Sequence, residues 1–400
     1  MTRFRDNIHN INSYLYILLG FFLPLSVSIG AAITVLIILL WLIEGNFAQK
    51  YTLIYKNPIT YAFLAFFLVH VLGLFWSENL EWGLKILKKE WRILAFIIFL
   101  TIVKKEHIKY YIFAFLAAMS ISEILSYGVW LEIIPPFKNA SVYNPTPFMS
   151  HISYNPFLAL SIFILIYLLF FKNLDKHIIS KIISTFFLLT MTINVFITGG
   201  RAGQIGFFVM LGLAFIFYFK KNIKISILLI LFVLPTIFYL AYNTSNIFNN
   251  RVNEAKSNLL QLEENRNTSV GRRITFAQNS LRIIKDNLLF GVGTGDFKLE
   301  YEKINQEHTP ELETPDQPHN MYLLVLVQTG IFGLMCMLWI FYLQFKVAFT
   351  KKAYKEIAIA LPTLFLVMMF SDSYLLGHYT TLLFVYFSAF LYKNFDNEID

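Results

Sequence analysis

Residues 223–242 read IKISILLILFVLPTIFYLAY, twenty positions with one charged side chain, Lys224. A helix of about 20 residues is as long as the apolar interior of a lipid bilayer is thick. A run of this length and composition is typical of a helix that crosses a membrane. The sequence therefore predicts a transmembrane helix here, and similar runs recur along the chain.

The whole chain shares this apolar character. Of its 400 residues, 57% are hydrophobic and 14% are charged, whereas a soluble domain has about 25% charged residues. One aqueous core cannot bury that much apolar surface, so lipid must surround much of the chain. The formal net charge of +8 does not indicate nucleic-acid binding, because most lysines lie in short loops between apolar runs. The single cysteine, Cys336, excludes an internal disulfide.

These runs predict an all-α polytopic membrane protein with about twelve transmembrane helices. The expected spans are residues 14–27, 30–43, 59–76, 91–103, 110–133, 152–171, 178–197, 203–219, 223–242, 320–345, 357–370 and 374–391. We expect three parts. They are an N-terminal bundle of about nine spans over residues 1–242, a helical outer loop over 243–318 between the ninth and tenth spans, and about three further spans over 319–400.

Lysines in the loops orient the spans. Basic residues gather in every second loop, and cytoplasmic loops are the ones that carry an excess of Lys and Arg. These loops hold Lys50 and Lys56; Lys104, Lys105 and Lys109; Lys172, Lys176 and Lys181; Lys220, Lys221 and Lys224; and Lys346, Lys351, Lys352 and Lys355. Both termini are therefore expected in the cytoplasm, and residues 243–318 on the outer side.

Two segments need separate interpretation. The loop over residues 77–90 carries three lysines although it is expected outside. We expect it to form an amphipathic helix in the membrane interface, an environment that suits its tryptophans, Trp76, Trp82 and Trp91. The apolar run after Arg3 and Arg5 is too long for a signal peptide and lacks a small-residue cleavage pattern, so we expect a retained first span.

The long outer segment contains one expected amphipathic helix. Apolar residues recur there at spacings of three and four, as one face of a helix requires. They are Ile274, Ala277, Leu281, Ile284 and Leu288. Thr268 or Ser269 is expected to cap the N-terminus of this helix, and Gly291 is expected to end it.

Three residues share one expected position, the outer N-terminal end of a helix. Arg201 opens the eighth span, Arg272 lies in the first turn of the loop helix, and His319 opens the tenth span. Helix N-termini attract anions through unpaired N–H groups. Arginine at such ends therefore indicates an external anion such as phosphate, which it holds through a planar fork. A neutral imidazole at His319 can act as a general base.

Each of these residues also has a simpler interpretation when it is taken alone. A single arginine at a membrane interface often anchors the chain to lipid headgroups, and a single interfacial histidine is often structural. The position that all three share favours a substrate site. The spacing by itself leaves both interpretations open.

The motifs around these residues resemble the O-antigen ligase family, which also contains O-antigen polymerases and protein O-oligosaccharyltransferases. In chain order they are Gly199-Gly200-Arg201; Arg272; Leu281-Arg282-Ile283-Ile284-Lys285-Asp286-Asn287; Gly291-Val292-Gly293-Thr294-Gly295-Asp296-Phe297; and His319-Asn320-Met321-Tyr322-Leu323 with Gly330 and Gly333. The motif block covers residues 198–333, and the number of expected spans extends the likeness to the whole chain.

This resemblance implies a glycosyltransferase of the bacterial inner membrane. Such an enzyme moves a glycan from undecaprenyl diphosphate at the periplasmic face, without ATP, metal or other cofactor. By motif position, Arg201 and Arg272 match the family's essential arginines and are expected to bind the substrate diphosphate. His319 matches its essential histidine, so the expected catalytic residues are these three.

The sequence departs from the family's pattern at two positions. Gly200 stands where the family often has Ser, and Phe276 stands where it often has Trp. Neither departure is expected to touch the chemistry. Arg273 adjoins Arg272 and is also a candidate for binding the diphosphate. We favour Arg272 as the arginine that faces the substrate, because it places Phe276 at the family's offset of four residues.

Other polar residues give weaker indications. Asp372, near the outer end of the eleventh span, is a candidate for orienting His319 or a substrate hydroxyl; the alternative is a helix-terminal acid in contact with water. The glycines from Gly291 to Gly295 follow a helix rather than a strand, so they predict a tight turn and not a dinucleotide site. No Asp-x-Asp pair or His/Glu cluster predicts a catalytic metal. Glu123 and His70 lie within apolar runs, where ionisable residues are functional candidates.

We expect an O-antigen ligase whose acceptor is lipid A-core, with membrane lipids as its surroundings and no nucleic-acid partner. The nearest alternatives are a polymerase, whose acceptor is another lipid-linked glycan, and a protein O-oligosaccharyltransferase. The alternative from another class is a transporter or flippase of lipid-linked glycans. Transporters usually show internal repeats and polar sites at the membrane midplane, whereas the polar residues of interest here cluster outside.

Overall fold

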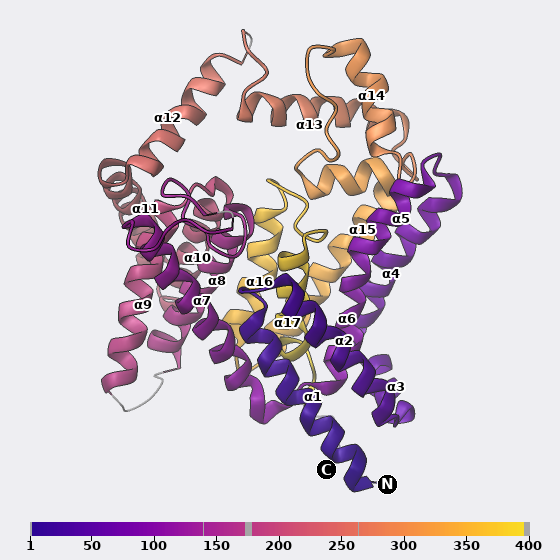
Figure 1. Cartoon of the computed structure of the whole chain (residues 1–400), viewed down its shortest axis with the longest axis vertical. Helices are drawn as coiled ribbons and strands as arrows, with labels where there is room; N and C mark the ends of the chain where they lie inside the picture. The colour runs from indigo at the N-terminus through magenta and orange to yellow at the C-terminus, as the bar shows by residue number, and fades with distance from the viewer. Residues whose placement is uncertain (1, 139, 173–177, 263, 396–400) are drawn as a thin grey trace. The chain divides into compact units, whose positions relative to one another are not determined.

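The computed structural model describes residues 2–138, 140–172, 178–262 and 264–395 (Figure 1). Within these ranges the chain is helical and contains no β-strand, only an isolated bridge between Ser141 and Asn144. The expected all-α class is therefore confirmed for the described part of the chain. Lys176, which was expected in a cytoplasmic loop, lies outside the described residues.

Eight helices in the described ranges are long and apolar enough to cross a membrane. They are Val27–Glu44, Pro58–Trp76, Lys105–Trp130, His151–Phe171, Ile178–Ile197, Arg201–Tyr218, Ile223–Thr244 and Met321–Thr350. This number of long apolar helices is that of a multi-pass membrane protein. The expected total of twelve spans stays a prediction.

The remaining expected spans form helices that are shorter or more charged than these eight. The helix α1 (Thr2–Phe22) carries charged residues in its first turns. The run over residues 91–103 is broken into a 3₁₀ turn, Trp91–Leu94, and the short helix α6 (Ala95–Ile102). Near the C-terminus, α16 (Lys355–Met368) and α17 (His378–Leu391) have 14 residues each.

The contacts divide the chain into two compact units, which are described separately. Unit 1 comprises Met1–Gly45, Ile102–Asn253 and Lys351–Leu364, and unit 2 comprises Asn46–Thr101, Glu254–Thr350 and Phe365–Asp400. The helices α6, α12 (Asn246–Leu260) and α16 contribute residues to both units, α6 only its last residue, Ile102, to unit 1. The expected division at residues 242 and 318 concerns the membrane topology and stays a prediction.

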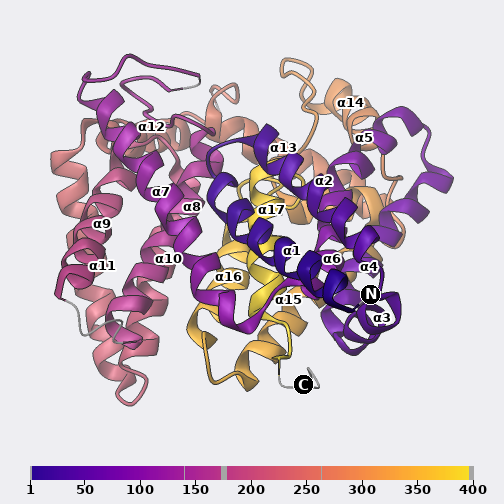
Figure 2. The same ribbon diagram turned by 60° about the horizontal axis from the view of Figure 1, so that its bottom comes forward.

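Unit 1 is a helical bundle with α8 in its core. Every residue of α8 from Tyr154 to Leu165 is buried, as in a helix that is apolar all round. This helix packs against α7, α9 and α10, and Figure 2 shows them with α11 in one bundle. The helices of unit 1 are α1, α2 (Val27–Glu44), α7 (Ile108–Trp130), α8 (His151–Ile166), α9 (Ile178–Ile197), α10 (Arg201–Tyr218) and α11 (Ile223–Thr244).

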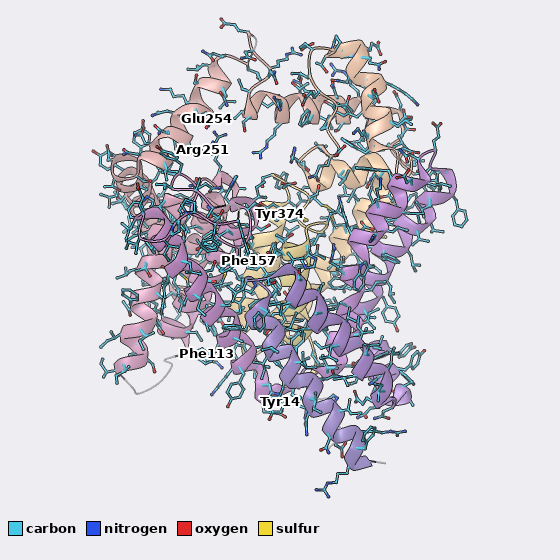
Figure 3. The ribbon with its side chains drawn as sticks, viewed as in Figure 1. Tyr14, Phe113, Phe157, Arg251, Glu254 and Tyr374 are labelled. Carbon is cyan, nitrogen blue, oxygen red and sulfur yellow. The ribbon has the colours of Figure 1, made fainter. Side chains whose placement is uncertain are left out.

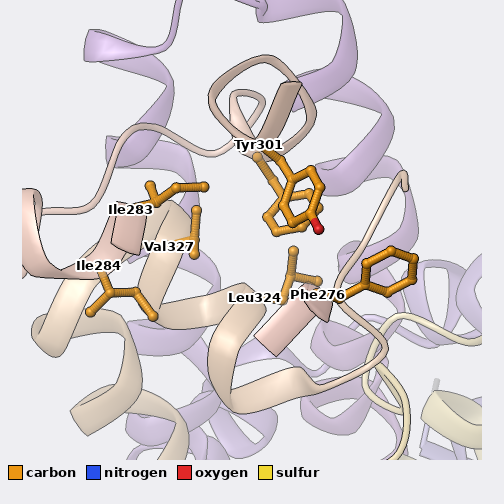
Figure 4. Packing of buried hydrophobic residues seen from close by; sticks show 7 residues of the cluster. Phe276, Ile283, Ile284, Tyr301, Leu324 and Val327 are labelled. Atoms are coloured by element: carbon orange, nitrogen blue, oxygen red, sulfur yellow. The ribbon is translucent and has the colours of Figure 1, made fainter. Parts of the chain in front are cut away.

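Unit 2 joins apolar helices to the helices of the long polar segment. The helix α4 packs along α15, and α13 and α14 pack on the N-terminal part of α15. Their shared core contains Phe276, Ile283, Ile284, Phe297, Tyr301, Leu324 and Val327 (Figure 4). Besides α6 and α17, the helices of unit 2 are α3 (Phe47–Lys56), α4 (Pro58–Gly73), α5 (Leu80–Glu90), α13 (Ser269–Asp286), α14 (Phe297–His308) and α15 (Met321–Thr350). The helix expected over residues 77–90 is therefore present as α5.

The buried face of α13 differs from the expected apolar stripe. Thr268 caps the helix by accepting a hydrogen bond from the N–H of Gly271, as expected. Leu281 and Leu288, however, are exposed, and α13 ends at Asp286, before Gly291. The face that packs on α14 and α15 is Gly271, Thr275, Phe276, Asn279, Ser280, Ile283 and Ile284.

The stripe was misplaced because part of the buried face is polar. The side-chain amide of Asn279 donates to the hydroxyl oxygens of Tyr301 (3.1 Å) and Thr309 (2.8 Å), and its carbonyl accepts from Arg282 (2.6 Å). A buried amide whose hydrogen bonds are made costs little. The expectation used apolar residues alone, so it assigned the wrong face of α13 to the core.

A short segment after α13 connects three helices of unit 2. Its backbone N–H groups all donate hydrogen bonds. From Val292 to Asp296 the acceptors are, in order, Val327 O, Gln328 O, Gly73 O, Ser77 Oγ and Gly293 O, at 2.8 to 3.3 Å. Gly291 has φ of 70°, and a side chain there would lie 2.4 Å from the backbone of Gln328. The segment therefore needs glycine where it crosses α15.

Asp296 ends this segment and is almost completely buried. Its carboxylate accepts hydrogen bonds of 2.8 Å from Ser77 Oγ, Glu78 N and Asn79 N. Asn79 is the N-cap of α5, so the carboxylate lies where the helix dipole favours negative charge. Asp296 thus links the N-terminus of α14 to the N-terminus of α5.

We expect Asp296→Ala to lower the free energy of unfolding by about 2 kcal/mol or more, because it leaves two N–H groups without their acceptor. The measurement is thermal unfolding of the purified protein in detergent. Asp316→Ala is the matched control, since Asp316 pairs with Lys298 at the surface (2.7 Å) and exposed pairs contribute little. Equal stability of the two variants would contradict this role of Asp296.

Candidate functional site

His319 lies at the start of α15 in a strained backbone conformation. Its φ is 51°, in the left-handed region, where a residue other than glycine costs about 1–3 kcal/mol. The next residue, Asn320, caps α15, because its side chain accepts a hydrogen bond of 3.1 Å from the N–H of Leu323. His319 was expected at this helix end. The strain indicates that neighbouring contacts hold the residue there.

Asp372 is one of these neighbours. Its Oδ1 lies 3.5 Å from Nδ1 of His319, which is longer than a typical hydrogen bond but close enough for an ion pair when the imidazole is protonated. The same oxygen accepts hydrogen bonds from the N–H of Ser373 (2.7 Å) and from Nε2 of Gln317 (3.2 Å). The carboxylate is therefore held in place beside the imidazole. The sequence did not predict a role for Gln317; its only indication was its position two residues before His319.

Phe276 is the other neighbour, and here the sequence-based expectation was wrong. Its ring stacks on the His319 ring, with centroids 6.2 Å apart and planes inclined by 25°. Phe276 was expected to lie apart from the chemistry. Because it is buried in the core of α13, α14 and α15, it fixes one face of the imidazole relative to α13. Its offset of four residues from Arg272 was the available signal, since such residues share a helix face.

The two arginines in the first turn of α13 have different surroundings. Arg272 is exposed, and its Nε donates a hydrogen bond of 2.7 Å to Oδ1 of Asn267. Arg273 interacts electrostatically with the hydroxyl of Tyr374, which is labelled in Figure 3 and lies two residues after Asp372. Unit 2 thus brings His319, Asp372 and the first turns of α13 together. The charge of Arg273 thus reaches the segment that carries Asp372.

Arg201 lies in unit 1 and is the first residue of α10, as expected, with Gly200 as the N-cap. A second arginine, Arg251 of α12 (labelled in Figure 3), lies close to Gly199 in the turn before Arg201. A side chain placed at Gly199 would meet its guanidinium at 3.2 Å. Arg251 was not among the expected site residues, because its sequence neighbours are polar and carry no motif. Unit 1 therefore places the guanidinium of Arg251 beside the turn that precedes Arg201.

The glycine-rich turn and His70 use their polar groups within the protein. The turn from Gly291 to Asp296 uses its N–H groups within the protein, so it has none to offer a phosphate. His70 is buried, with its Nε2 3.4 Å from Glu90, and its carbonyl accepts a hydrogen bond from Thr294 (2.6 Å). Glu123 is buried within α7. In the described part of the chain, no group of three His, Cys, Asp or Glu residues is arranged to hold a metal ion.

Comparison with known proteins identifies a family for the central part of the chain. Residues 186–338 match the model of a family described as O-antigen ligase. An uncharacterized protein of Haemophilus influenzae is 32% identical over 151 residues, which are 36% of this chain and 37% of that protein. The match to this relative thus covers little more than a third of its length. The resemblance expected from the motifs is confirmed for residues 186–338, a segment that contains Arg201, Arg272 and His319.

Proposed function

Because residues 186–338 carry the sequence pattern of the O-antigen ligase family, we propose that this protein is an O-antigen ligase. In this proposal it transfers a glycan from undecaprenyl diphosphate to lipid A-core at the periplasmic face of the bacterial inner membrane. The observation that carries the proposal is the family match over residues 186–338, which contain His319 and Phe276 in contact with each other. Asp372, from a later part of the chain, lies beside the same imidazole. The long apolar helices support a membrane enzyme with a lipid-linked substrate.

In the proposed reaction, arginines bind the diphosphate of the donor. The bond between the anomeric carbon and the phosphate oxygen breaks, and its electron pair remains on the diphosphate. Negative charge therefore grows on the leaving group, and a guanidinium fork can compensate it. We assign this role to Arg201 and Arg272, with Arg273 as a further donor. A well-placed donor of this kind lowers the barrier by about 3 kcal/mol.

His319 is the proposed general base. Its Nδ1 faces Asp372, so the other ring nitrogen, Nε2, is the one available to an acceptor hydroxyl. Nε2 takes the hydroxyl proton while the oxygen attacks the anomeric carbon. The carboxylate of Asp372 then stabilises the imidazolium, as a buried acid does for a catalytic histidine. Phe276 restricts rotation of the ring, which keeps Nε2 directed toward the acceptor.

The proposed topology places both termini in the cytoplasm and the site residues outside. It rests on the lysine-rich loops, since positively charged loops remain on the cytoplasmic side. A polymerase or a protein O-oligosaccharyltransferase would use the same donor chemistry with another acceptor. The moderate length of the outer segment favours the ligase. A transporter or flippase would not need a general base beside a carboxylate.

We expect Arg201→Ala, Arg272→Ala and His319→Ala each to lower glycan transfer about 100-fold, because each removes a group that acts on the transition state. The assay uses purified protein, an undecaprenyl-diphosphate-linked glycan and lipid A-core. Lys285→Ala, in the last turn of α13, is the matched control and should transfer at the rate of the unchanged protein. Unchanged transfer by all three variants at normal protein levels would overturn the mechanism.

We expect Phe276→Leu to lower kcat about threefold to tenfold, whereas Phe276→Trp should keep most of it, because aromatic stacking on His319 contributes about 0.5–1.5 kcal/mol. Phe297→Leu is the control, since Phe297 is buried in the same cluster and its ring contacts that of Tyr301 rather than that of His319. A loss of kcat in Phe297→Leu equal to that in Phe276→Leu would show that core packing, not the imidazole, is responsible.

We expect a deletion strain to accumulate lipid-linked polymer of normal length, with no polymer on lipid A-core, because a ligase acts after chain growth. The glycolipids are separated by gel electrophoresis and identified by mass spectrometry. Lipid A-core that carries a single repeat would indicate a polymerase instead. Loss of glycoproteins with normal lipopolysaccharide would indicate protein glycosylation.

A further inference from the structure

A network of buried polar side chains holds the turn before Arg201 in unit 1. The carbonyl of Thr198 accepts a hydrogen bond of 3.1 Å from the amide of Gln204, and the N–H of Gly199 donates one of 3.3 Å to Oδ1 of Asn144. Asn155 on α8 donates from Nδ2 to the carbonyl of Gly200 at 3.2 Å. The polar backbone groups of a turn that is buried among apolar helices are thus bonded to side chains.

Asn155 is the residue that connects this turn to the core of unit 1. It is fully buried, and both ends of its amide are used. While Nδ2 donates to Gly200, Oδ1 accepts a hydrogen bond of 2.7 Å from the hydroxyl of Thr198. A buried amide without partners would cost several kcal/mol. The side chain of Asn155 avoids this cost because both its polar ends bond to the turn, and these bonds require the conformation that the turn has.

The fit between Asn155 and α10 is close. A side chain at Gly200 would lie 2.6 Å from Nδ2 of Asn155, and one at Gly203 would lie 2.1 Å from its Cβ. The two glycines therefore allow α10 to approach α8 at this residue. The close contact with Asn155 requires a small residue at position 200. This chain has Gly200 there, where the family often has Ser.

The hydrogen bond from Asn155 fixes the direction of one peptide group. The carbonyl of Gly200 accepts from Asn155 and also from the N–H of Gln204 (3.1 Å), within α10. In a trans peptide the C=O and the following N–H point in opposite directions. With the Gly200 carbonyl directed into the bundle, the N–H of Arg201 points out of the N-terminus of α10, the direction in which a helix attracts anions.

We infer that Asn155 is a positioning residue for the donor diphosphate, because it holds the Gly200–Arg201 peptide and thereby sets the point from which the Arg201 side chain extends to bind the anion. The inference rests on the proposed function, in which Arg201 binds that diphosphate. Asn155 acts through Arg201 and does not itself contact the substrate. It follows that Asn155 matters only while Arg201 is present.

The test is a double-mutant cycle on lipid binding. Dissociation constants for undecaprenyl diphosphate are measured for the unchanged protein, Asn155→Ala, Arg201→Ala and the double variant, with undecaprenol as the lipid that lacks phosphate. We expect Asn155→Ala to weaken diphosphate binding about tenfold, as the loss of one well-placed interaction does. Its additional effect in the Arg201→Ala background should be less than about twofold, because residues that act as a unit are not additive.

Two further variants separate positioning from folding. Ser161→Ala removes another fully buried polar group of α8, whose hydroxyl bonds within the helix to Phe157 O (2.8 Å). It should leave diphosphate binding unchanged. Thr198→Val removes the hydroxyl that bonds Oδ1 of Asn155 at nearly constant volume, so it tests the same network if Asn155→Ala does not accumulate in the membrane. We expect it to weaken binding in the same direction, again only when Arg201 is present.

The outcomes are distinct. Additive effects of Asn155→Ala and Arg201→Ala, or normal binding by Asn155→Ala and Thr198→Val, overturn the inference while the effect of Arg201→Ala leaves the proposed function standing. If the unchanged protein binds undecaprenyl diphosphate no more tightly than undecaprenol, the proposed function fails and the inference fails with it. Loss of binding in Ser161→Ala equal to that in Asn155→Ala also overturns it, because any buried polar group would then be equivalent.

Discussion

Backbone polar groups that are buried among apolar helices must find hydrogen-bond partners inside the protein. Within a helix, the backbone groups satisfy this requirement by bonding to one another. In the described part of the chain, the long apolar runs are helical. Each break in a helix needs side chains instead. Asn155 and Gln204 supply them for the turn before Arg201, and Gln328 supplies one for the carbonyl of Thr294 in the segment that follows Gly291. The carboxylate of Asp296 accepts from the backbone N–H groups of Glu78 and Asn79, in the connection from α4 to α5. The polar residues within apolar helices are therefore largely partners of interrupted backbone.

The same requirement explains why the glycine-rich segment from Gly291 to Gly295 makes its contacts within the protein. Its N–H groups are directed to α4, to Ser77 and to α15, so the segment acts as a connector. By fixing the start of α14 relative to α5, it also supports the core against which α13 packs. The position of Phe276, and through it one face of His319, depends on that core. Chemistry at the imidazole thus rests on contacts far from it in sequence.

His319 illustrates how such a scaffold can prepare a catalytic group. Its left-handed backbone is unfavourable by itself, and the cap on α15, the stacked Phe276 and the nearby Asp372 together offset the cost. An imidazole that is stacked on one face by a ring, with a carboxylate 3.5 Å from one nitrogen, is restricted in how it can turn. In the proposed transferase this means that the acceptor hydroxyl meets a base that is already oriented.

The sequence alone determined the helical class, most of the long spans, the N-cap at Thr268, and the placement of Arg201 and His319 at helix ends. These features depend on local composition and on residues three or four positions apart, which are visible in a chain without its fold. Motif order also indicated the family that residues 186–338 match. The tertiary structure decided which face of α13 is buried, that Phe276 stacks on His319, and that Asn155 holds the turn before Arg201. Those contacts join residues from different helices, and whether a polar side chain such as Asn155 or Asn279 can be buried depends on the partner that another helix brings to it.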